Sequence, residues 1–199
     1  MKSRLRIVLP LCLAIGSLVI GCGSDDDRDM LTVMTYNVYL GADTSGLFAQ
    51  LVAGAGPQQL LSDAGKAFNA MERSDFPLRA TAIAESIAAH EPHFIGLQEM
   101  VVVRQDPTNF ALNPMPDAET EVIDFRKVMM QALQAEGMNY EIAAQVQNMD
   151  IELPMCLVEL STCLSDPTMI QDGRLTMFDV LLVRDDVEVS EPMQRNYSV

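Results

Sequence analysis

One carboxylate in the sequence stands where functional side chains are often placed. Glu99 follows Gln98 at the end of Phe94–Leu97, an apolar run that is too short for a helix and therefore predicts a buried strand. Strand ends and loops carry many binding and catalytic residues, because the rigid elements beside them fix the positions of those side chains. Glu99 is the first candidate for a site, and a solvated strand-end carboxylate is the alternative interpretation.

Two cysteines offer chemistry of another kind. Cys156 and Cys163 lie seven positions apart in the segment 150–173, which we predict to be a long loop. In an exported protein such a pair can close a short loop as a disulfide, and the alternative is two free thiols in a buried turn. The choice depends on the compartment of the protein, which the amino-terminal segment indicates.

The amino-terminal segment has the pattern of an export signal. Residues 2–6 carry three positive charges, and Ile7–Ile20 is an uncharged apolar run that is too short for a good membrane span. The run ends in LVIGC at 18–22, which resembles the bacterial lipobox. The resemblance implies a signal peptide at 1–21, a lipid on Cys22, and an exported protein anchored to the bacterial cell envelope or surface. A plain secretory signal and an uncleaved anchor are the alternatives.

Composition and charge restrict the possible partners. The chain has 199 residues, 49% of them hydrophobic, and a formal net charge of -15. We expect a small acidic tether at 22–30 and one domain over 31–199. An acidic protein repels phosphate backbones at long range, which disfavours tight non-specific binding of nucleic acid unless a bound divalent cation reverses the local charge.

The elements that must position Glu99 alternate between strands and helices. Before Glu99 we expect a buried strand at 31–40, two helical pieces within 45–71 that form an insertion or lid, and a helix from Ser74 or Asp75 to just before Pro92. After it we expect a helix at 121–136, a strand at 140–147, the loop 150–173, and one or two strands within 175–189. This order predicts an α/β (α+β) fold with a mixed sheet and helices on its outer face.

Two of these segments resemble the motifs of a known family. The first strand ends in TYNV at 35–38, and the segment before and including Glu99 reads PHFIGLQE at 92–99. These stretches resemble the first two motifs of the endonuclease/exonuclease/phosphatase superfamily, T-x-N-V and P-D-x-I-x-L-Q-E. The stretch 175–184 is similar in position to the family's third core strand pair. The resemblance implies two mixed β-sheets packed face to face and flanked by helices.

The resemblance also implies a reaction and a cofactor. Members of the family hydrolyse phosphate esters with Mg²⁺ (or Mn²⁺), which offsets negative charge that develops on the phosphoryl oxygens. Glu99 corresponds to the metal ligand, and Asn37 to an oxygen donor close to the metal or the scissile phosphate. A single glutamate suffices as the main anchor, because Mg²⁺ keeps several waters and is usually held by one or two carboxylates.

Four other residues have weaker claims to a role. Arg79 could reach a phosphate, pair with an acid, or simply be solvated on a helix surface. Asp179 could belong to the site or be a polar residue at a strand edge. His93 replaces the aspartate of the second motif, which we interpret as a strand-start variant. Neither His93 nor His90 stands where the family has its catalytic histidine.

The sequence departs from the family in its later part. The family completes its site with G-D-x-N and S-D-H motifs, and neither occurs in this sequence. We therefore expect a fragment of the domain that holds mainly the first sheet and is inactive as given. The complete protein is predicted to be a nuclease-like or phospholipase C-like phosphodiesterase that acts on a nucleic acid or a phospholipid, with no protein partner inferred. The alternative is a non-catalytic surface lipoprotein that uses the same fold as a binding module.

Overall fold

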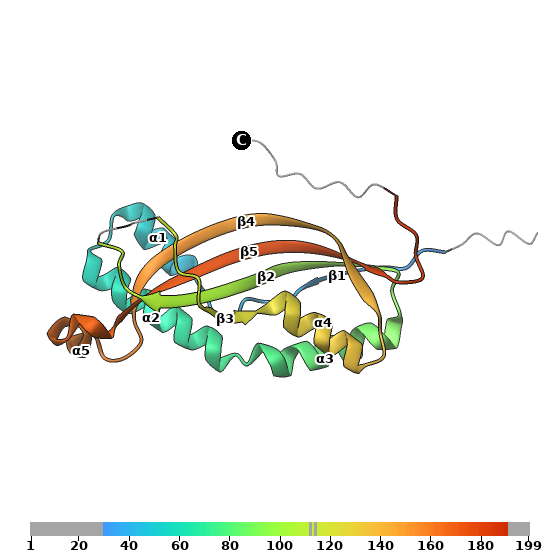
Figure 1. Ribbon diagram of the computed structural model, residues 1–199, viewed down its shortest axis with the longest axis horizontal. Helices are drawn as coiled ribbons and strands as arrows, with labels where there is room; N and C mark the ends of the chain where they lie inside the picture. Colours follow the sequence, from blue (N-terminus) through green and yellow to red (C-terminus); the bar gives the residue numbers. More distant parts are fainter. Residues whose placement is uncertain (1–29, 112, 114, 191–199) are drawn as a thin grey trace, which may run out of the picture. The chain divides into compact units, whose positions relative to one another are not determined.

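The described part of the chain is built around one mixed sheet. The computed structural model describes residues 30–111, 113 and 115–190, in which five strands have the order β1-β2-β5-β4, with β3 paired to β2. The strands are β1 (Val33–Asn37), β2 (Phe94–Pro107), β3 (Glu121–Asp124), β4 (Tyr140–Cys156) and β5 (Ile170–Arg184). β1 and β2 are parallel, and the other pairs are antiparallel (Figure 1).

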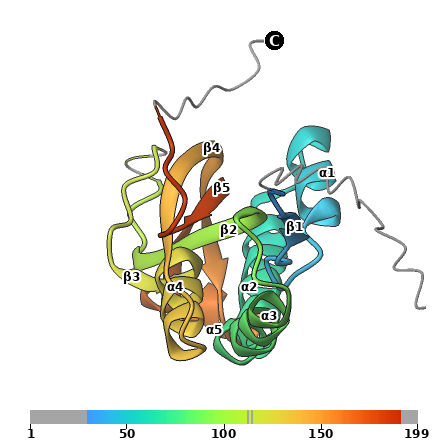
Figure 2. The same cartoon turned by 90° about the vertical axis from the view of Figure 1, so that its right-hand side faces the viewer.

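Helices flank this sheet and complete the core. They are α1 (Ser45–Ala53), α2 (Pro57–Arg73), α3 (Phe76–His90), α4 (Phe125–Ala135) and the short α5 (Leu160–Ser165), which a 3-10 turn, η1 (Pro167–Met169), follows. α2, α3 and α4 lie along one side of the sheet (Figures 1 and 2). The predicted α+β fold with a mixed sheet flanked by helices is confirmed. The described residues form one sheet, whereas the family resemblance implies two.

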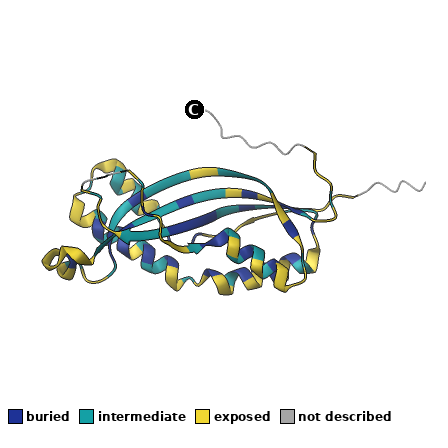
Figure 3. Cartoon of the chain, viewed as in Figure 1, coloured by how far each residue is buried: buried dark blue, intermediate teal, exposed yellow. Residues whose placement is uncertain are grey.

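Burial follows this arrangement of the layers. Buried residues run along the centre of β2 and on the sides of the helices that face the sheet (Figure 3). The rings of Phe76 and Phe125 stack with centroids 3.6 Å apart where α3 meets α4. Within the described ranges, no helix combines the length and the apolar character that a membrane span requires. The predicted signal peptide, the predicted lipidation site at Cys22 and the predicted tether up to residue 29 lie outside the described residues.

α3 forms where its end signals predict it. The Asp75 side chain caps the helix by accepting a hydrogen bond from the Leu78 N–H at 3.3 Å, and Pro77 occupies the first turn, where its missing N–H costs nothing. The helix ends at His90, and its C-cap residue Glu91 has a left-handed backbone with φ 42°. The predicted helix between Asp75 and Pro92 is therefore confirmed.

The two helical pieces predicted within 45–71 are present, but the second is not an insertion or lid. α2 places Ala64, Phe68 and Met71 in the main hydrophobic core, so it is part of the layer that covers the sheet. α1 is different, because none of its residues is buried. The amphipathic spacing of α2 and its burial make it a structural element of the domain.

Other predictions of secondary structure were wrong in extent or in burial. The predicted helix 121–136 begins only at Phe125, because residues 121–124 form β3 on the edge of β2. The predicted loop 150–173 is largely the end of β4, α5 and the start of β5. The predicted buried strand 31–40 is the exposed strand β1, which has β2 as its one partner among the described strands.

Candidate functional site

Glu99 lies at a bulge inside a long strand and not at a strand end. β2 continues to Pro107, and its register with β5 shifts between Leu97, paired with Val180, and Met100, paired with Phe178. Two residues of β2 therefore stand opposite one residue of β5, and Glu99 takes a left-handed backbone with φ 60°. Bulges of this kind re-aim a side chain and occur often beside active sites, and a positive φ at a non-glycine residue is a strained conformation.

The structure brings Glu99 and Asn37 into direct contact. The Asn37 amide Nδ2 donates to Glu99 Oε1 at 2.8 Å, and the Leu40 backbone N–H donates to Glu99 Oε2 at 2.8 Å. The Asn37 Oδ1 accepts from the Tyr39 N–H at 2.8 Å, which fixes the orientation of the amide. Each carboxylate oxygen has two lone pairs, so Glu99 can still ligate a cation while it accepts both hydrogen bonds.

A tight turn after β1 aims the Leu40 N–H at the carboxylate. Val38 donates its N–H to the Gln98 carbonyl at 3.1 Å, and Tyr39 and Gly41 have positive φ values of 60° and 104°. A Cβ on Gly41 would lie 2.2 Å from the Ser74 Oγ. The position therefore requires glycine both for its backbone conformation and for its close packing.

Arg79 of α3 holds this turn in place through hydrogen bonds. Its guanidinium donates to the Val38 carbonyl at 2.5 Å, to the Ser74 carbonyl at 3.0 Å and to the Ser74 Oγ at 3.1 Å. It also lies 5.1 Å from the ring centroid of Phe76 and 5.7 Å from that of Tyr39. Burial lowers the pKa of Arg79 from its ordinary value. These contacts make Arg79 a positioning residue for the turn that carries the Leu40 N–H.

Asp179 is the β5 residue opposite the bulge. It is exposed, and Leu97 and Met100 pair with the residues on either side of it. Asp179 shares a face of the sheet with Leu181, because side chains two positions apart on a strand point the same way. Leu181 pairs with Gly96, which pairs in turn with Thr35 on β1. The register thus places a second carboxylate next to the bulge.

The two histidines lie at the other end of this region. His93 Nδ1 accepts a hydrogen bond from the Thr32 N–H at 3.0 Å, and the His93 N–H donates to the Thr32 carbonyl at 2.8 Å. His93 therefore joins the starts of β1 and β2, whereas Asn37 lies at the end of β1. His90 Nδ1 contacts the Ser86 carbonyl at 2.7 Å within α3. These contacts give both histidines structural partners.

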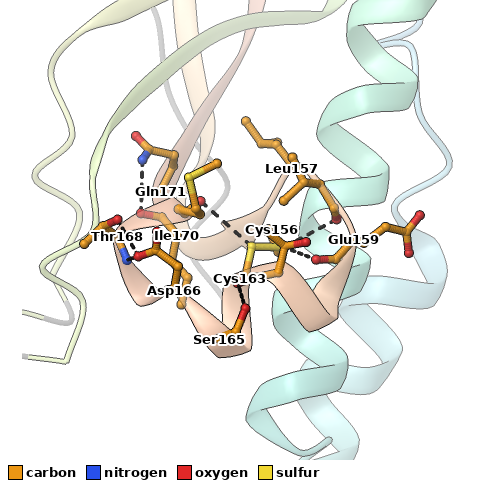
Figure 4. Close-up of a disulfide and its surroundings, with 12 residues drawn as sticks. Cys156, Leu157, Glu159, Cys163, Ser165, Asp166, Thr168, Ile170 and Gln171 are labelled. Atoms are coloured by element: carbon orange, nitrogen blue, oxygen red, sulfur yellow. Dashed lines mark hydrogen bonds between the residues drawn. A yellow bond between two sulfur atoms is a disulfide. The ribbon is translucent and has the colours of Figure 1, made fainter.

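Cys156 and Cys163 form a disulfide, which Figure 4 shows. The bond connects the end of β4 to α5, and Leu61 of α2 packs against it in a small apolar cluster. Both cysteines are buried, with 3% and 0% of their surface exposed. A buried disulfide of this type is a structural staple, and it is typical of proteins that fold in an oxidising compartment.

The side chains near the bulge that could ligate a cation are carboxylates. Among the described residues, no group of three or more His, Cys, Asp or Glu side chains is arranged to hold a metal ion. A Mg²⁺ site does not need such a group, because one or two carboxylates and several waters suffice. The carboxylates of Glu99 and the neighbouring Asp179 therefore fit the ligand preference of a hard cation and not that of zinc or copper. The expected oxygen donor at Asn37 is already used, because its Oδ1 accepts from the Tyr39 N–H and its Nδ2 is the group that contacts Glu99.

Comparisons with known proteins give no relative for this chain. No family model, no curated protein and no solved structure matches it. Sequence reasoning gave Asn37 and Glu99 as candidates but did not predict the hydrogen bond from the Leu40 N–H or the contacts of Arg79 with the turn. The glycine at position 41, shortly after the end of the first strand, was the available signal in the sequence for a tight turn.

Proposed function

We propose that the complete protein hydrolyses phosphate esters with Mg²⁺ or Mn²⁺, and that Glu99 is the main protein ligand of the cation. The observation that carries the proposal is the 2.8 Å hydrogen bond between Asn37 and Glu99 at the bulge. Asn37 and Glu99 are 62 residues apart in the sequence, and their side chains are in contact. A functional site requires its polar side chains to lie together, whereas two chance motif matches give no reason to expect this contact.

The residues of this chain have separate tasks in the proposed site. The Asn37 Nδ2 and the Leu40 N–H hold the Glu99 carboxylate in one orientation, so that its remaining lone pairs face the cation without reorganisation. Asp179 adds a second negative charge on the same stretch of the sheet. When bound, the cation supplies positive charge against the phosphoryl oxygens. A bound cation also offsets the repulsion between this acidic chain and an anionic substrate, whether nucleic acid or phospholipid.

The proposal is tested by substituting Glu99. In Glu99→Gln the charge that holds the cation is lost, and we expect Mg²⁺ and Mn²⁺ affinity, and the activity of the complete protein, to fall by about two orders of magnitude. Glu85→Gln is the matched control, since Glu85 is exposed on α3. The measurements are calorimetric metal titration and hydrolysis of a generic aryl phosphodiester. Unchanged metal binding in Glu99→Gln removes Glu99 from the site.

The same pair of measurements separates an enzyme from a binding module. The second candidate function, a non-catalytic surface lipoprotein, is favoured by the position of His90 and His93, which lie away from Glu99 and leave the bulge without a histidine among the described residues. Cation binding at Glu99 without hydrolysis of DNA, RNA, sphingomyelin or the aryl diester by the complete protein identifies the binding module.

We also propose that the protein is exported and held on a membrane by a lipid on Cys22. The Cys156–Cys163 disulfide supports export, since such bonds persist in oxidising compartments. Mass spectrometry of membrane-extracted protein should show an acylated amino terminus at Cys22 with residues 1–21 removed. An intact Met1, or wild-type protein in the soluble fraction, contradicts this proposal.

A further inference from the structure

Among the described residues, four that are not glycine have a left-handed backbone, and two of these have a structural reason for it. Asp75 and Glu91 are the cap residues at the two ends of α3. The other two, Tyr39 and Glu99, each have a φ of 60°, and they are neighbours in space, because the Leu40 N–H next to Tyr39 donates to Glu99. A left-handed backbone is costly for a bulky residue, and such strain gathers at functional sites.

Tyr39 is an exposed aromatic residue within a buried turn. Its neighbours Val38 and Leu40 are 1% and 5% exposed, whereas Tyr39 is 50% exposed. Its N–H donates to the Asn37 Oδ1 at 2.8 Å, so the turn fixes the backbone of Tyr39 beside the groups that hold Glu99. A tyrosine ring gives a ligand a large contact area and loses little side-chain entropy on binding.

The charge beside the ring decides which organic group it suits. The Arg79 Cζ lies 5.7 Å from the Tyr39 ring centroid, and hydrogen bonds to Val38 and Ser74 keep the guanidinium in place. A quaternary ammonium such as choline would bring a second positive charge to the same ring and be repelled by Arg79. An uncharged planar ring meets no such repulsion and stacks well on an aromatic side chain. Tyr39 therefore suits a nucleobase better than choline.

The charge of the whole chain limits the size of the ligand. The formal net charge is -15, and the long-range repulsion of a nucleic acid by an acidic protein grows with the number of its phosphates. A nucleotide ester with a single phosphate meets the least repulsion.

We propose that Tyr39 is a substrate-contacting residue of the cation site and that it stacks on the base of a small nucleotide ester. This inference rests on the proposed function, because the phosphate of the ester is taken to lie at the cation beside Glu99. It narrows the substrate class of that function from a nucleic acid or a phospholipid to a small nucleotide ester.

Binding of three phosphomonoesters tests this choice. Thymidine 5′-phosphate, ethyl phosphate and phosphocholine share the phosphate group and differ in the organic group. In calorimetric titrations of the complete protein at saturating Mn²⁺, thymidine 5′-phosphate should bind at least about fivefold more tightly than ethyl phosphate, which is the lower end for one stacked base. Phosphocholine should bind no more tightly than ethyl phosphate. A smaller preference for thymidine 5′-phosphate, tighter binding of phosphocholine, or no binding of any ligand overturns the proposal.

Three variants assign the preference to the Tyr39 ring. Tyr39→Phe keeps the ring and should keep the preference, while Tyr39→Leu keeps the backbone N–H but should bind thymidine 5′-phosphate no better than ethyl phosphate. Tyr36→Leu is the matched control, because Tyr36 is 39% exposed on β1 and its side chain points to the opposite face of the strand from Asn37. Its preference should equal that of the wild type. An equal loss for all three ligands in Tyr39→Leu, or a preference that survives in it, contradicts stacking.

Mn²⁺ titration without a phosphomonoester separates this proposal from that of the cation site. Tyr39→Leu should bind Mn²⁺ like the wild type, because the groups that contact Glu99 are retained, and weaker Mn²⁺ binding would identify a structural role for Tyr39 instead. Unchanged Mn²⁺ binding in Glu99→Gln means that the cation proposal fails. Loss of Mn²⁺ in Glu99→Gln, with no preference for thymidine 5′-phosphate in the wild type, means that only the inference about Tyr39 fails.

Discussion

Replacing Arg79 with methionine tests whether the guanidinium holds the turn that orients Glu99. The substitution keeps an unbranched side chain but removes the donors to the carbonyls of Val38 and Ser74, at 2.5 and 3.0 Å. A hydrogen bond to a charged group contributes about 1.5–3 kcal/mol. Two such bonds give up to about 6 kcal/mol. Part of this loss is offset, because methionine does not carry the cost of burying a charge, which lowers the pKa of Arg79. We expect a net loss of about 3 kcal/mol.

The assay is urea unfolding followed by circular dichroism, with thermal unfolding as a second measure. For a domain of this size about 3 kcal/mol lowers the Tm by about 6–12 °C. Arg73→Met is the matched control, because Arg73 is exposed at the end of α2, and its effect should stay within about 0.5 kcal/mol. Hydrogen exchange at the Leu40 amide should accelerate in Arg79→Met alone. Equal stability of the two variants, with unchanged exchange at Leu40, refutes the positioning role.

Two further predictions concern packing and pH. Gly65→Ala should destabilise the fold by about 2 kcal/mol, because the new Cβ would lie 1.8 Å from the Cys156 carbonyl oxygen, whereas Gly46→Ala in α1 meets no atom within 4 Å and should stabilise it by about 0.5–1 kcal/mol; urea midpoints compare the two. The hydrogen bonds from Arg174 lower the pKa of Asp150, so its contribution to stability is present above the unfolded pKa of about 3.9 and is lost as the pH falls through the folded value. Asp150→Asn should therefore lose less stability than the wild type between pH 5 and pH 3, and an identical acid profile would contradict this reasoning.

Local signals in the sequence predicted the elements that local interactions determine. α3 follows from the Asp75 cap, Pro77 in the first turn and Pro92 beyond its end, each of which acts within a few residues. The two motifs implied that Asn37 and Glu99 belong to one site, and the structure brings the two side chains into contact, but the sequence contains no separate signal for the bulge. A left-handed backbone at a glutamate is imposed by neighbouring strands, so local propensity cannot reveal it.

The parts of β4 and β5 that lie within the predicted loop 150–173 were missed for a different reason. Residues 150–156 alternate between polar and apolar, but Pro154 and the acidic side chains favoured a loop. β4 is an edge strand among the described strands, which tolerates a proline. The Glu152 carboxylate accepts the N–H groups of Asp117 and Ala118 at 2.9 and 2.7 Å. The buried Glu152 carboxylate in β4 thus has hydrogen-bond partners from a distant segment of the chain, and these partners cannot be predicted from the local sequence.

The parallel pairing of β1 with β2 has a consequence for the order in which the protein folds. Val33 of β1 pairs with Phe94 of β2, and three helices lie between the two strands in the sequence. Closing such a long loop costs chain entropy before the contacts between the strands can form. The antiparallel hairpin of β4 and β5 has no such delay, so β1 should join late. Because Asn37 and the Leu40 N–H arrive with β1, a nearly folded chain still has a disordered Glu99 carboxylate. The proposed cation site is therefore a property of the finished fold, and if Glu99 binds the cation, metal binding during refolding should report the last step.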